Sequence, residues 1–220
     1  MISVRHRQQV QQQDADLLLR MKQTHFSEDE CKALVNKFKF MTKDNKVARQ
    51  DKLDRSQFHE VLQSTFKMTD DMIMDRLMRA FDKDSDSCVN LSEWIIGLSV
   101  FLRGSEEEQV KFCFEVYDLN GDGFISKEEM FHLLKNSLVK QPNEEDPDEG
   151  VRELVDISIK KMDIDRDGRI SLQDFQAAVK EESLLLEAFG QCLPAPELAI
   201  AFVEKAFSVP DHRGRYNQLY

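Results

Sequence analysis

The sequence lacks most of the features that mark membrane-spanning, lipid-anchored and nucleic-acid-binding proteins. Its longest apolar run, residues 94–102, contains a glycine and a serine and is far shorter than the roughly 20 residues that cross a bilayer. Positive charge is scarce, because 30 Lys and Arg stand against 41 Asp and Glu and leave a net charge of −11. The sequence begins Met1-Ile2-Ser3, without the glycine that N-myristoylation needs. We therefore expect no membrane span, no lipid anchor and no nucleic-acid partner.

Cysteine frameworks and catalytic motifs are also missing. The four cysteines, at positions 31, 88, 113 and 192, do not have the spacing of a disulfide or zinc framework, so we expect reduced thiols of a cytoplasmic protein. Neither a Gly-rich phosphate loop nor a nucleophile elbow occurs, and the 5 histidines are scattered. We therefore expect no enzyme, and we assign no catalytic residue and no residue that binds an organic cofactor.

What the sequence does contain is one 12-residue pattern that occurs three times. The copies begin at Asp82, Asp118 and Asp163, and each has oxygen-bearing side chains at positions 1, 3, 5, 9 and 12, as in the EF-hand loop. The seventh ligand position uses a backbone carbonyl, and calcium takes six to eight such oxygens. The predicted metal ligands are Asp82, Asp84, Asp86, Cys88, Asn90 and Glu93; Asp118, Asn120, Asp122, Phe124, Ser126 and Glu129; and Asp163, Asp165, Asp167, Arg169, Ser171 and Asp174.

The three loops differ in quality as calcium sites. Loop 118–129 has every preferred residue, including the glycine of the sharp turn, and we expect it to bind most tightly. Loop 82–93 has Ser87 at that turn, at a cost of roughly 1–2 kcal/mol, or about tenfold in affinity. Loop 163–174 closes with Asp174, which is one methylene shorter than glutamate and favours magnesium. We expect up to three bound Ca²⁺, with Mg²⁺ competing at loop 163–174.

A fourth, silent hand precedes these loops. Counting back from Asp82 by the interval between the first two loops reaches Lys46, and this alignment matches Leu53 with Val89 and Phe58 with Trp94. EF-hands pair through a short strand at loop position 8, so the silent hand is expected to pair with loop 82–93. The silent loop has basic residues where carboxylates belong, namely Lys46, Arg49, Lys52 and Arg55.

Together these observations predict an all-α EF-hand fold with two lobes of paired hands, four hands in all, and additional helices at both ends. Capping-box spacing at Ser27 and Ser105 predicts two helix starts. A helix predicted over residues 197–208 is expected to pack on its own lobe, with a regulatory plug that a target displaces as the alternative. The predicted divisions are an N-terminal helical extension (1–24), an N-lobe (25–104), a C-lobe (105–190) and a C-terminal helix and tail (191–220).

Two further segments bear on how the lobes work. The acidic, proline-containing connector at residues 141–150 is expected to be solvated, and residues 103–105 are expected to hinge the lobes. Four methionines before loop 82–93 have two interpretations, ordinary core packing or a pliable groove for a partner. They are Met68, Met72, Met74 and Met78.

Several stretches resemble an axonemal member of the neuronal-calcium-sensor-like family. They are residues 67–76, 101–105, 118–134, 140–150 and 184–194. The resemblance implies a four-hand calcium sensor that regulates outer-arm dynein in motile cilia and sperm flagella. It also implies the dynein heavy chain, the outer dynein arm docking complex and the doublet microtubule as partners, within the axonemal cytoskeleton. The alternatives are a cytosolic calcium buffer and an EF-hand regulatory subunit of a phosphatase-like enzyme.

Overall fold

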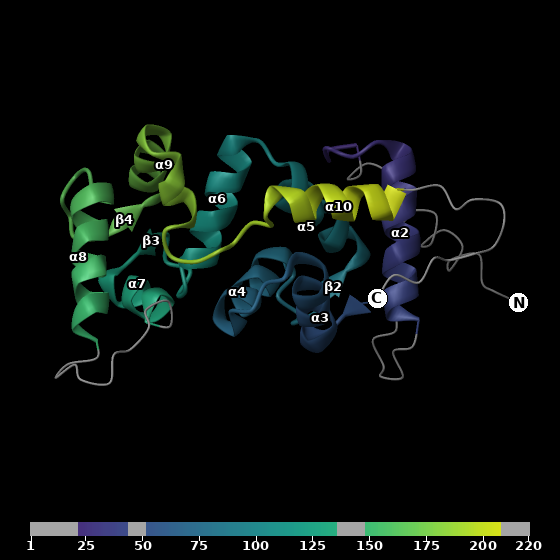
Figure 1. The fold of residues 1–220 in the computed structure, drawn as a ribbon, viewed down its shortest axis with the longest axis horizontal. Helices are drawn as coiled ribbons and strands as arrows, with labels where there is room; N and C mark the ends of the chain where they lie inside the picture. The colour runs from purple at the N-terminus through teal and green to yellow at the C-terminus, as the bar shows by residue number, and fades with distance from the viewer. Residues whose placement is uncertain (1–21, 44–51, 136–147, 208–220) are drawn as a thin grey trace, which may run out of the picture.

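The computed structural model describes residues 22–43, 52–135 and 148–207 (Figure 1). Predictions for Lys46 and Arg49, for most of the N-terminal extension and for most of the connector lie outside these residues. The described chain consists of helices and two small two-stranded sheets, which confirms the all-α EF-hand prediction. None of its helices has both the length and the apolar character that spanning a membrane requires.

The first half of the described chain contains two hands joined by an antiparallel strand pair. Leu53 lies opposite Val89, which is the pairing predicted for a silent hand that keeps its scaffold. Asp54 and Gln57 form a capping box at loop positions 9 and 12 of this hand, so the turn survives without an acidic closing residue. The elements are α2 (Glu28–Thr42), β1 (Lys52–Leu53), α3 (Arg55–Phe66), α4 (Asp71–Phe81), β2 (Val89–Asn90) and α5 (Leu91–Arg103).

The second half repeats this arrangement, with Ile125 opposite Ile170 in the strand pair. Capping boxes at Ser27 and Ser105 begin α2 and α6, as predicted. Because α8 begins at Glu149, the last two residues of the predicted connector are helical, and that part of the prediction is wrong. The elements are α6 (Glu106–Tyr117), β3 (Phe124–Ile125), α7 (Lys127–Leu134), α8 (Glu149–Met162), β4 (Ile170–Ser171), α9 (Leu172–Glu181), η1 (Ser183–Glu187) and α10 (Pro196–Phe207).

One apolar core runs through both halves. Phe112 of α6 lies against Phe81 of α4 and Phe101 of α5, with ring centroids 6.1 Å apart in each pair. Phe81 also lies against Gly97, where a Cβ atom would come within 2.3 Å of the ring, so α4 and α5 approach closely only because this residue is glycine. Of the four methionines, Met68, Met74 and Met78 are buried and Met72 is partly buried against the core. Core packing therefore accounts for them.

The C-terminal helix does not pack where the sequence predicted. Its extent matches the prediction, but α10 lies against α2 and α3 of the first half (Figure 1). Phe202 lies 5.3 Å from the ring of Phe66, and the Lys37 ammonium lies 4.2 Å from the centre of the Phe202 ring. The prediction that this helix packs on its own lobe is wrong.

The turn before α10 explains this course. Tyr117 at the end of α6 donates a hydrogen bond to the carbonyl oxygen of Gly190 at 2.6 Å, and Phe189 packs on the Tyr117 ring at 5.3 Å. Gly190 also approaches α4, because a Cβ atom there would lie 3.0 Å from Ile73 Cδ1. The chain is thereby held at the boundary between the halves and continues onto α2.

Candidate metal centres

Each loop folds around the aspartate at its first position. Asp82, Asp118 and Asp163 directly follow α4, α6 and α8 as C-cap residues. In each loop the carboxylate of this aspartate accepts hydrogen bonds from the backbone amides at positions 5 and 6, at 2.7 to 3.2 Å. The first predicted ligand is therefore held at the centre of a closed turn.

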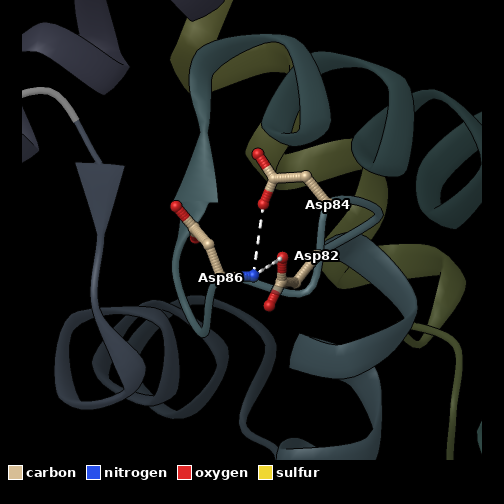
Figure 2. Close-up of side chains that lie close together, drawn as sticks. All are labelled: Asp82, Asp84 and Asp86. Atoms are coloured by element: carbon tan, nitrogen blue, oxygen red, sulfur yellow. Dashed lines mark hydrogen bonds between the residues drawn. The ribbon is translucent and has the colours of Figure 1, made fainter.

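The aspartates at positions 1, 3 and 5 come together in two of the loops. Carboxylate oxygens of Asp82, Asp84 and Asp86 lie within 4.8 Å of one another, as Figure 2 shows, and those of Asp163, Asp165 and Asp167 do the same. Loop 118–129 has Asn120 in the middle position, and its amide nitrogen donates to Asp122 at 3.0 Å. These oxygen clusters fit a hard divalent cation.

Crowding of like charges is strongest in loop 163–174. The Asp167 amide donates a hydrogen bond that favours the charged form of Asp165, but desolvation and repulsion from Asp167, Asp174 and Asp163 outweigh it and raise the pKa of Asp165. A divalent cation would remove this repulsion. The arrangement agrees with the prediction that the loop holds a metal.

The residue at position 12 has two roles in every loop. Glu93, Glu129 and Asp174 are buried, and each is the third residue of the exiting helix, where it forms a capping box with position 9. In loop 82–93 the other carboxylate oxygen accepts from the amides of Lys83 at 3.0 Å and Asp84 at 3.1 Å. The closing residue is thus part of a helix start and already reaches across the loop.

The shorter Asp174 makes the same connection less closely. It accepts from the Ile164 amide at 3.3 Å, where Glu93 accepts from the equivalent Lys83 amide at 3.0 Å. Burial opposes its ionisation, but hydrogen bonds from Ser171 and Ile164 outweigh burial and lower the pKa of Asp174. This geometry agrees with the prediction of a weaker closing ligand.

The backbone separates the loops more clearly than the sequence did, because positions 4 and 6 are both left-handed. Sequence reasoning recognised position 6 alone. Loop 118–129 has glycine at both positions, loop 163–174 has it at one, and loop 82–93 has serine at both. The φ values are 57° at Ser85, 66° at Ser87, 76° at Gly121, 87° at Gly123, 62° at Arg166 and 88° at Gly168. Side chains with a Cβ atom are strained there, which supports the predicted order of affinities.

Replacing Ser87 by glycine is expected to raise the calcium affinity of loop 82–93 by up to about tenfold, because it removes strain of about 1–2 kcal/mol. Calorimetry on the full chain checks this in a background with Asp118→Ala and Asp163→Ala, which leaves only this loop intact. Gly123→Ala in the unaltered chain is the reverse control and should weaken loop 118–129, where a Cβ atom meets nothing within 4 Å and φ alone is at issue. An affinity that Ser87→Gly leaves unchanged would contradict the explanation by strain.

Sequence reasoning missed two basic side chains that reach the loops. Lys52 of β1 lies against Asp84 and Asp86 of the neighbouring loop. Arg76 of α4 donates to the carbonyl oxygens of Val116 at 3.2 Å and Leu119 at 2.9 Å, and so holds the start of loop 118–129. The alignment of the silent hand was a signal for Lys52, since it places this residue beside the paired strand position. The sequence carried no such signal for Arg76.

The remaining predicted ligands lie on the same loops. Asn90, Ser126 and Ser171 are the N-caps of α5, α7 and α9, so their side chains face the closing residues. The carbonyl ligands at Cys88, Phe124 and Arg169 stay predictions, as does the assignment of every ligand to an ion.

Comparison with known proteins agrees with this geometry. The family description "EF-hand domain pair" matches residues 107–180. The chain is 65% identical to calaxin from Homo sapiens over 159 residues, which are 72% of this chain and 75% of that protein. It is 54% identical to calaxin from Xenopus laevis over 198 residues, or 90% of this chain and 95% of that protein. The type 2 form of the calcineurin B-type subunit from Bos taurus is 35% identical over 158 residues, covering 71% and 86% of the two chains.

The EF-hand pair and the acidic loops make the chain a calcium-binding sensor, which is a regulatory protein and not an enzyme. Identities above 50% over most of both chains, with relatives from several vertebrates, show that it belongs to the calaxin family.

Proposed function

We propose that this protein senses calcium in motile cilia and sperm flagella and there regulates outer-arm dynein. Its proposed partners are the dynein heavy chain and the outer dynein arm docking complex on the doublet microtubule, and its proposed location is the axoneme. Membership of the calaxin family and the resemblance to an axonemal calcium sensor support this assignment. The net charge of −11 favours basic surfaces on the partner and gives no support to nucleic acid or anionic membrane.

The observation that carries the sensor proposal is the double role of the closing residues. Glu93 accepts from amides across its loop and also caps α5, and Glu129 has the same relation to α7. A calcium ion would take these carboxylate oxygens as ligands and so compete with the amides. Because the carboxylates belong to the first turns of helices, ion capture would change the directions of those helices.

Contacts between the halves would carry this change along the molecule. Arg76 joins α4 to the start of loop 118–129, and Phe112 packs among residues of α4 and α5. A movement of α6 at that loop would therefore reach the first half directly. We propose up to three bound Ca²⁺, with Mg²⁺ competing at loop 163–174 because of its shorter closing residue.

A second candidate function is that of a regulatory subunit of a phosphatase-like enzyme. The 35% identity to a calcineurin B-type subunit over 158 residues favours it. The two candidates share the EF-hand scaffold and differ in the partner, so recovery of the partner separates them.

The proposed function is tested by affinity capture with the full chain as bait, in calcium and in chelator. We expect dynein heavy chain and docking-complex subunits from ciliated cells, and a loss of the calcium-dependent part with an Asp82→Ala, Asp118→Ala, Asp163→Ala bait. Recovery of a phosphatase catalytic subunit in place of dynein components would overturn the assignment. A buffer would bind calcium without exposing apolar surface, so an apolar dye whose fluorescence ignores calcium would favour that alternative.

A further inference from the structure

A lysine of the silent hand lies against the oxygen cluster of the neighbouring loop. Lys52 is the first residue of β1, and its ammonium donates a hydrogen bond to Asp86 Oδ2 and lies 3.6 Å from Asp84 Oδ2. The pairing of Lys52 with Asn90 fixes its backbone beside loop 82–93. The side chain is 27% exposed, so the strand pair and the loop together enclose most of it.

Calcium needs the same oxygens. Asp84 and Asp86 occupy positions 3 and 5 of loop 82–93, and a bound ion would take an oxygen from each at about 2.3–2.6 Å. An ammonium group at hydrogen-bond distance from these carboxylates would lie within a few ångströms of the ion, where two positive charges repel strongly. Metal and ammonium therefore cannot both hold these two side chains in their present positions.

We propose that Lys52 is a built-in competitor of calcium at loop 82–93. Its ammonium neutralises Asp84 and Asp86 when metal is absent and leaves them when the ion enters. The lysine thereby lowers the calcium affinity of this loop and makes ion binding depend on β1 of the silent hand. This inference rests on the calcium binding proposed above and assigns to the silent hand a part in setting the affinity.

The other strand pair is built differently. The residue equivalent to Lys52 in loop 163–174 is Arg169, which is also basic. Its guanidinium lies over the Phe124 ring, 3.8 Å from the centroid, and 3.5 Å from Asp167 of its own loop. The cation of that pair is thus engaged by an aromatic ring and a carboxylate of its own loop, whereas Lys52 reaches the carboxylates of its neighbour.

Calorimetric titration of the full chain tests the proposal in the Asp118→Ala, Asp163→Ala background, where loop 82–93 alone is intact. Lys52→Met keeps the apolar stem and removes the charge. Its calcium affinity is expected to rise about three- to tenfold, as for the loss of one or two partly exposed ion pairs, and Lys52→Arg should keep the parent affinity. Lys52→Gln is a second neutral variant should the methionine disturb folding, which circular dichroism in chelator will show.

Lys83→Met is the matched control. Lys83 belongs to loop 82–93 itself, but its ammonium binds Glu115 at 2.6 and 2.8 Å, so this variant makes the same change of net charge outside the cluster. We expect less than about a twofold change in affinity, because exposed ion pairs contribute little. Equal gains in the two variants would show an effect of net charge alone and overturn the proposal, as would an unchanged affinity with Lys52→Met.

Chemical labelling gives a second readout that a purely structural role would not change. Reductive methylation of the wild-type chain, quantified at each lysine by mass spectrometry, should label Lys52 faster in calcium than in chelator, while Lys83 labels equally in both. Equal labelling of Lys52 in both conditions would overturn the displacement step. A wild-type chain that binds no calcium would instead refute the proposed function, so the two failures are distinguishable.

Discussion

Replacing Asp118 by alanine is expected to remove the tightest calcium-binding event, with a loss of roughly 100-fold in the affinity of that loop. The substitution removes the first ligand of loop 118–129, the loop with glycine at both left-handed positions. It also leaves the amides of Gly121 and Gly123, which donate to Asp118 at 2.7 and 2.8 Å, without their acceptor. Loop closure and ion binding are therefore lost together.

Calorimetric titration with calcium, at millimolar magnesium, measures this loss against the wild-type chain. Asp163→Ala is expected to remove a weaker event that magnesium suppresses, because loop 163–174 closes with the shorter Asp174. Asp29→Ala is the matched control, since this aspartate of α2 is 93% exposed and lies outside the loops. A tight phase that persists in Asp118→Ala would overturn the predicted order of affinities.

Replacing Phe202 by alanine is expected to release α10 from the first half of the molecule. Phe202 is the one buried residue of this helix in the described chain and contacts Phe66 and Lys37. Truncation of a buried phenylalanine costs about 3–5 kcal/mol, more than a single short helix with one buried side chain is expected to withstand. The surface of α2 and α3 would then become accessible to an apolar dye.

Dye fluorescence and amide hydrogen exchange over α10 measure the release. Ile200→Ala is the control on the same helix, because Ile200 is 59% exposed and its truncation should leave both signals unchanged. Protection of α10 that survives Phe202→Ala would show that other contacts, such as that of Phe207 with Phe26 at 6.0 Å, hold the helix. If a target competes with α10 for this surface, the variant will bind it more tightly than wild type, as the regulatory-plug alternative requires.

The features that sequence could predict are those encoded within a dozen neighbouring residues. The acidic loops, the capping boxes at Ser27 and Ser105 and the pairing of Leu53 with Val89 all follow from local spacing repeated along the chain. An apolar stripe on a helix, by contrast, indicates that one face is covered but not by what. This is why the extent of α10 was predicted correctly and its packing partner was not.

The contacts between the halves could not be predicted for the same reason. Arg76 occurs on a helix with other charged residues, where solvent exposure is the ordinary expectation, yet its guanidinium holds carbonyl groups of a segment 40 residues away. Lys52 was recognised as a basic residue of the silent loop, but its contact with Asp86 depends on the strand pairing. The left-handed position 4 carried glycine in one loop of three, too little to mark it.

The position of α10 has a consequence for how the protein is made. Ribosomes synthesise a chain from its N-terminus, so α2 and α3 emerge long before the helix that covers them. Phe66 and Phe26, which contact residues of α10, consequently remain uncovered until translation is almost complete. The earliest part of the chain to appear is thus the last to mature, and nascent chains stalled before residue 196 should be the ones that chaperones retain.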